Sequence, residues 1–167
     1  MSSTGASGSA PRVLVYGYGN PGRQDDGAGI AVVDALEAWA RDEDRPWLSF
    51  DRNYQLNAED ALTASGSDVV IFVDATRDQE EGFLFRQIQA TRSVAFSTHA
   101  MGPESVLALC RDLYGRVPHA FLLTIRGYQW EPNEPMTPEA RENCARAHTY
   151  LAGLLDDPRA LGGPGGR

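Results

Sequence analysis

Residues 17–29 read GYGNPGRQDDGAG, a glycine-rich loop that follows a short apolar run and leads into a helical pattern. The run, residues 12–17, is rich in β-branched and aromatic side chains and stops at glycine, which is typical of a buried parallel strand. From residue 26 to about residue 40, apolar side chains recur at steps of three and four, and Asp25 or Asp26 is placed to cap the first turn. The loop is therefore predicted to connect a strand to a helix.

The same alternation continues along the chain and predicts the fold class. Further strands are expected at residues 47–50, 68–75, 83–90 and 120–128, and further helices at residues 58–64, 103–114 and 137–155. The fourth strand alternates apolar and polar side chains, as a half-exposed edge strand does. Strands interleaved with helices predict an α/β fold, with an open, mostly parallel, twisted five-stranded sheet and helices on both faces.

Length and charge set limits on domains and partners. The 167 residues suit a single domain, expected at residues 11–156, between a disordered leader at 1–10 and a flexible tail at 157–167 that is rich in glycine and proline. The net charge of −8 argues against nucleic acid or an anionic membrane as a partner. Because the sequence shows neither a signal peptide nor a membrane-spanning apolar run, we expect a cytoplasmic protein, which we take to be a monomer.

Two interpretations of the glycine loop follow from its spacing and charge. Gly17, Gly19 and Gly22 have the spacing of a dinucleotide fingerprint, and Asp51 after the second strand could bind a ribose, which would make the protein a nucleotide-binding oxidoreductase. A pyrophosphate would, however, occupy the amino end of the helix, where Asp25 and Asp26 stand. Two carboxylates would repel it.

The acidic pair suits a cation instead. Asp74 ends the third strand, and the first and third strands of an open α/β sheet commonly lie side by side, so Asp26 and Asp74 are expected to converge. His99, in the loop 97–105 before a helix, is a third candidate on the same rim. Two carboxylates and an imidazole suit zinc, nickel, iron or manganese. Each of these residues also has an ordinary explanation, as a cap, a turn residue or a solvated side chain, so spacing alone leaves the metal site open.

Three segments taken in order, GYGNPGRQDDGAG, IFVDA at 71–75 and STHAMGPESVLAL at 97–109, resemble the hydrogenase maturation endopeptidases. Proteins of this family are hydrolases that remove a C-terminal extension from the large-subunit precursor of nickel-iron hydrogenases. The resemblance spans roughly residues 12–155 and implies that Asp26, Asp74 and His99 are the catalytic and metal-contacting residues. It also implies a dependence on nickel, which is recognised in the precursor, although another divalent metal such as zinc could accompany the purified protein. A non-catalytic maturation chaperone is the other alternative.

One segment departs from the family pattern. Many members carry a glycine-rich segment after the second strand, where this chain reads DRNYQLNAED at 51–60. The triplet Tyr54-Gln55-Leu56 resembles the subgroup that serves NAD-coupled bidirectional hydrogenases, although an ordinary loop with Tyr54 packed inward is equally compatible. Asn20 is expected to hold the turn and Asp25 to cap the helix and steady the loop. Whether the metal or a carboxylate activates the attacking water stays open.

Overall fold

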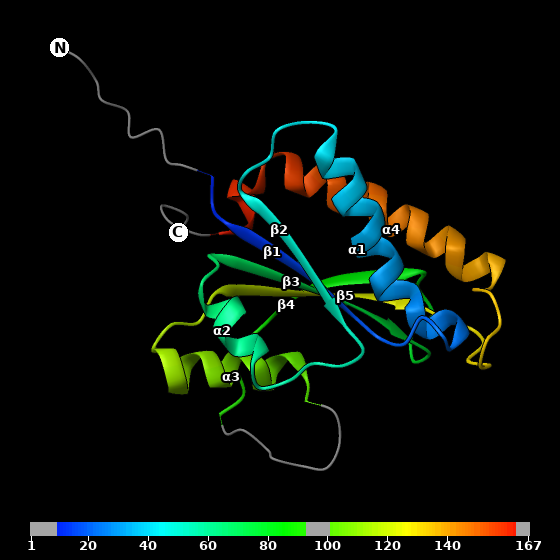
Figure 1. Ribbon diagram of the computed structural model, residues 1–167, viewed down its shortest axis with the longest axis horizontal. Coiled ribbons are helices and arrows are strands. Elements are labelled where there is room, and N and C mark those ends of the chain that lie inside the picture. The colour runs from blue at the N-terminus through cyan, green and yellow to red at the C-terminus, as the bar shows by residue number, and fades with distance from the viewer. Residues whose placement is uncertain (1–9, 93–100, 163–167) are drawn as a thin grey trace.

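A computed structural model of the protein describes residues 10–92 and 101–162. In these residues strands and helices alternate, and each strand and helix predicted from the sequence is present (Figure 1). The strands are β1 (Val13–Tyr18), β2 (Leu48–Asn53), β3 (Val69–Thr76), β4 (Phe83–Ile88) and β5 (His119–Arg126). The helices are α1 (Ala28–Arg41), α2 (Asp60–Ser65), α3 (Pro103–Tyr114) and α4 (Pro138–Asp156), with single 3₁₀ turns η1 (Gln24–Gly27) and η2 (Pro158–Leu161).

The five strands form one sheet in the order β2-β1-β3-β5-β4. The pairs β1–β2, β1–β3 and β3–β5 are parallel, and only β4 runs antiparallel, at the edge beside β5. The fold class and the edge position of the fourth strand are therefore confirmed. Because β1 and β3 are neighbours, their carboxyl ends meet at one edge of the sheet, as the sequence predicted.

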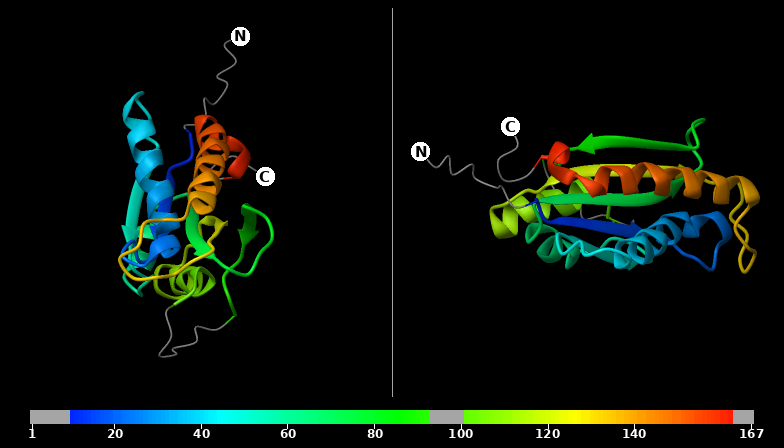
Figure 2. Two further views of the ribbon diagram at one scale, coloured as in Figure 1. Left: turned by 90° about the vertical axis from the view of Figure 1, so that its right-hand side faces the viewer. Right: turned by 90° about the horizontal axis from the view of Figure 1, so that it is seen from above.

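The sheet carries an apolar layer on each face because successive side chains of a strand point in opposite directions. Val13, Val15 and Ile71 pack with the side chains of α1 and α4, whereas Leu14 and Phe72 pack with those of α2 and α3. Figure 1 and the end-on view in Figure 2 show these two helix pairs on opposite sides of the sheet. Among the described residues, no helix combines the length and hydropathy that crossing a bilayer requires.

The structure corrects the start of the first helix. Residues 24–27 form η1, so α1 begins at Ala28, with Gly27 as its N-cap residue and without a capping side chain. The prediction that Asp25 or Asp26 caps this helix is therefore wrong, since both carboxylates bind elsewhere. The second strand is also longer than predicted, and Asp51 lies within β2, where its side chain accepts a hydrogen bond from the backbone N–H of Arg52 at 2.8 Å.

The folded part of the chain extends past the predicted boundary at residue 156. Turn η2 buries Pro158 and Leu161, and Leu161 belongs to the core beneath α4, so the segment predicted as a flexible tail is folded up to this turn. The expected leader lies outside the described residues, apart from Ala10. Residues 163–167 also lie outside them.

Candidate functional site

Two glycines allow the loop after β1 to lie against the end of β3. Gly19 has a φ of 138°, a conformation that favours glycine, and a Cβ there would collide with the backbone oxygen of Asp26. A Cβ on Gly29 would collide with the carbonyl oxygen of Val73, the residue before Asp74. The absence of side chains at these positions therefore lets η1 approach the carboxyl edge of the sheet closely.

Asp26 lies on η1, and a hydrogen bond holds one of its two carboxylate oxygens. The backbone N–H of Asn20 donates to Oδ2 of Asp26 at 2.9 Å, and the side chain of Asn20 accepts from the N–H of Gly22 at 2.9 Å. Asn20 thus holds the turn, as the sequence predicted, and does so through a hydrogen bond between its side chain and the backbone. Among the described residues Oδ1 of Asp26 has no hydrogen-bond partner, so it remains available to a ligand.

Asp74 lies near the end of β3 and is half-buried. Burial raises the pKa of its carboxyl to about 7, the negative charge of Asp26 contributes to the rise, and hydrogen bonds from the Ala75 N–H and the Tyr18 hydroxyl oppose it. The structure therefore brings Asp26 and Asp74 close enough for one charge to influence the other. Two carboxylates in such an arrangement form an oxygen-rich site that suits a divalent cation.

Tyr18, at the end of β1, is a site residue that the sequence reasoning missed. Burial raises the pKa of its phenol far above the ordinary value, so the hydroxyl stays protonated and donates to Asp74. The available signal was its position as the last residue of a strand that enters the glycine loop. Without knowledge of the strand pairing, that position does not show which side chain it reaches.

His99, the third predicted residue, lies outside the described residues. The chain is described again from Met101, which pairs with Leu56 in an isolated bridge just after β2. This bridge places Met101 near the carboxyl edge of the sheet, because the last residue of β2, Asn53, is paired with Tyr18. The described residues hold no cluster of three metal-ligating side chains.

Tyr54 and Gln55 lie in the loop after β2 and are exposed. Tyr54 is 69% exposed, which excludes the inward-packed alternative for this side chain. The next residue, Leu56, is buried and anchors the loop. The loop therefore presents both polar side chains to solvent.

Asp25, predicted to cap the first helix, is fully buried and holds a different loop. Its carboxylate accepts hydrogen bonds from the N–H groups of Tyr128, Gln129 and Thr137 and from the Thr137 hydroxyl, at 2.7 to 3.1 Å. Burial alone would raise the pKa of this carboxyl, but these bonds hold it below the usual value. We call this set of bonds the Asp25 latch. It ties η1 to the loop between β5 and α4.

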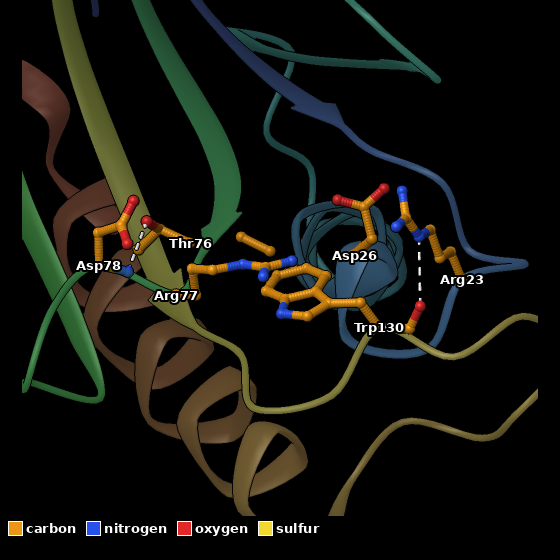
Figure 3. A pocket seen from close by; sticks show the side chains of 7 residues that line it. Arg23, Asp26, Thr76, Arg77, Asp78 and Trp130 are labelled. Atoms are coloured by element: carbon orange, nitrogen blue, oxygen red, sulfur yellow. Dashed lines mark hydrogen bonds between the residues drawn. The ribbon is translucent and has the colours of Figure 1, made fainter.

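A pocket of about 260 Å³ lies beside Asp26, between the turn after β3 and the latched loop (Figure 3). Arg77 stacks over the indole of Trp130, with its guanidinium carbon 5.0 Å from the ring centroid. Arg23 donates from Nε to the carbonyl oxygen of Trp130 at 3.2 Å. Thr76 and Asp78 complete the polar wall. No motif or spacing in the sequence predicted this pocket.

A scan against models of protein families finds no match, and neither does a search among curated proteins. Solved structures do match. The [NiFe] hydrogenase maturation protease HycI from Thermococcus kodakarensis gives a TM-score of 0.70 at 22% identity, covering 90% of this chain and 95% of that one. The hydrogenase maturating endopeptidase HybD from E. coli gives 0.66 at 22% identity, covering 87% and 93%. The hydrogenase 2 maturation peptidase from a Thaumarchaeota archaeon gives 0.64 at 21% identity, covering 87% and 98%. The chain therefore shares the fold of these proteases over nearly its whole length.

Proposed function

We propose that this protein is an endopeptidase that removes the C-terminal extension of a nickel-iron hydrogenase large-subunit precursor. The observation that carries the proposal is the approach of Asp26 to Asp74 at the carboxyl edge of a sheet whose fold is that of maturation proteases. The ordered sequence segments around both residues, and the segment around His99, point to the same family. Fold and motif resemblance thus agree on one reaction class.

The cation in this proposal belongs to the substrate. Asp26, Asp74 and His99 contact the nickel already held by the precursor, so that the metal positions the scissile bond beside the site. Oδ1 of Asp26, which has no hydrogen-bond partner among the described residues, supports this role, as does the hydroxyl of Tyr18, which fixes the orientation of Asp74. A divalent ion such as zinc would occupy the same donors in the protein alone.

Hydrolysis needs a water molecule placed against the peptide carbonyl and a group that takes its proton. In our proposal Asp26 serves both metal contact and water activation, because among the described residues a hydrogen bond reaches only one of its two carboxylate oxygens. Asp74, fixed by the Tyr18 hydroxyl and the Ala75 N–H, holds the cation in place. The polarising charge on the carbonyl comes from the substrate's nickel.

The client hydrogenase in this proposal is of the NAD-coupled bidirectional type. The exposed side chains of Tyr54 and Gln55 lie in the loop after β2, at the same edge as Asp26, and are free to contact a large partner. Replacing both with alanine should therefore slow processing of the bidirectional precursor and leave the free energy of unfolding nearly unchanged. Processing of a membrane-bound uptake hydrogenase precursor at equal efficiency would contradict this client assignment.

The reaction is tested with purified nickel-loaded and nickel-free precursor, followed by mass spectrometry of the large subunit. The wild-type protein should remove the extension only from the nickel-loaded precursor. The variants Asp26→Asn, Asp74→Asn and His99→Ala should each leave the extension uncleaved. Asp44→Asn, an exposed carboxylate between α1 and β2 and so at the amino edge of the sheet, is the matched control and should still process. Equal cleavage of both precursor forms would refute the dependence on nickel.

The same experiment separates the alternatives. A maturation chaperone would bind the precursor and leave its mass unchanged. A nucleotide-binding oxidoreductase would change the fluorescence of NAD(P)H on binding, but the structure speaks against it because the Asn20 N–H, which a phosphate would need, is already bound to Asp26.

A further inference from the structure

The pocket beside Asp26 is lined by two arginine side chains, although the protein as a whole is acidic. The whole chain has a net charge of −8, yet the side chains of Arg23 and Arg77 both line this pocket. In the part of the chain that the structure describes, neither forms an ion pair. Other exposed arginines, such as Arg41 and Arg116, pair with carboxylates. The two guanidinium groups at the pocket are therefore free to bind an anionic group from outside.

Both guanidinium groups are held in place by Trp130. Its indole supports the planar guanidinium of Arg77, and its carbonyl oxygen accepts from Nε of Arg23. No other described residue pairs with the terminal amino groups of Arg23, which can therefore donate to a ligand. Stacking on an aromatic ring restricts an arginine side chain before the ligand arrives, so less conformational entropy is lost on binding. Figure 3 shows Arg77 extended across the indole, with Arg23 and Asp78 on opposite sides.

The charge of the pocket changes when substrate is bound. Asp26 and Asp78 balance the two arginines in the free protein. Under the proposed function, Asp26 faces the nickel of the precursor and its charge is compensated there. The two positive charges of the arginines are then balanced by the single negative charge of Asp78, so the pocket has a net positive charge and attracts an anion.

The geometry points to a subsite for an acidic side chain in the C-terminal extension of the substrate, close to the bond that is cleaved, with Arg77 and Arg23 as its specificity-determining residues. This inference rests on the proposed function and names a feature of its substrate. A carboxylate matches the planar fork of a guanidinium, which can donate two parallel hydrogen bonds to it. The pocket lies next to Asp26, so the acidic residue belongs within a few positions of the scissile bond.

The test uses nickel-loaded precursor in a series in which each of the first six positions after the scissile bond carries glutamate, glutamine or lysine in turn. At one position, glutamate should give a KM about five-fold lower than glutamine with the wild-type protein, the size expected of a charge pair of about 1 kcal/mol. Arg77→Gln should remove this preference, and Arg77→Glu should favour lysine at the same position. The preference should also shrink as salt is added.

Two further variants separate recognition from folding. Arg159→Gln, on η2 away from the pocket, is the matched control and should keep the wild-type preference. Trp130→Phe, which keeps an aromatic support under Arg77, should keep more of the preference than Trp130→Leu. A preference that persists in both Arg77→Gln and Arg23→Gln, or no charge preference at any position, would overturn the inference. If the wild-type protein cleaved no precursor at all, the proposed function itself would be wrong, whereas cleavage without charge preference would leave it standing.

Discussion

Replacing Asp74 with asparagine should stabilise the folded protein near neutral pH, because burial raises the free energy of the ionised Asp74 carboxylate in the folded state. Burial, together with the charge of Asp26, raises the pKa of this carboxyl from 3.8 to about 7. The unfolded chain loses the proton near pH 4 and the folded chain near pH 7, so the folded form is favoured below pH 4 and loses this advantage as the pH rises through 7. Asparagine stays neutral throughout.

The size of the effect follows from the shift. About three pKa units correspond to about 4 kcal/mol, which is an upper value. Because Asp74 is half-buried and solvent reaches it, we expect a gain of about 2 kcal/mol in the free energy of unfolding at pH 8. At pH 4 the variant and the wild type should differ little.

Urea unfolding of both proteins at pH 4 and pH 8 measures this difference directly. Asp78→Asn removes an exposed carboxylate from the adjacent turn and should change the free energy of unfolding by less than about 0.5 kcal/mol at either pH. A variant no more stable than the wild type at pH 8, or equally stabilised at both pH values, would show that burial does not disfavour the charged form. A confirmed gain would mean that Asp74 is retained at the expense of stability, as functional residues often are.

Three other predictions concern the support of the site. Asp25→Ala should lower the free energy of unfolding by about 3 kcal/mol, because it leaves the four donors of the Asp25 latch without their acceptor. A decrease of less than about 1 kcal/mol, measured by thermal unfolding, would argue against the latch. Gly29→Ala should cost about 2 kcal/mol or more because the new Cβ meets a carbonyl of β3, whereas Gly153→Ala in open space on α4 should be neutral or stabilising in the same urea assay. Tyr18→Phe removes the hydroxyl that donates to Asp74, so it should raise the pKa of that carboxyl further above 7. NMR titration of the carboxyl carbon would reveal an unchanged value if the bond were unimportant.

The fold was predictable because local patterns carry most of its information. Continuous apolar runs marked β1 and β3, the two strands buried on both faces, and alternation in residues 83–90 marked the edge strand β4. The start of α1 was not predictable in this way. Asp25 has the residue type and position of a helix cap, but hydrogen-bond donors more than one hundred residues further along the chain compete for its carboxylate. Whether the Asp25 carboxylate binds donors of its own helix or donors of the loop between β5 and α4 depends on the folded position of that loop.

In the candidate site too, some residues can be placed from local sequence patterns, whereas others meet only through contacts between distant segments. Asp26 and Asp74 could be predicted as neighbours because each ends or follows a parallel strand, and parallel neighbours deliver their carboxyl ends to one edge whatever side chains they carry. Arg77 and Trp130 belong to different loops and meet only through side-chain stacking, which no spacing in the sequence encodes. Under the proposed function, the backbone would therefore determine where the nickel of the substrate is contacted, whereas the side chains of two distant loops would determine which extension is accepted. If the proposed function holds, exchanging positions 77 and 130 with their counterparts in a maturation protease of the same fold should transfer the preference for the extension without transferring the metal contact.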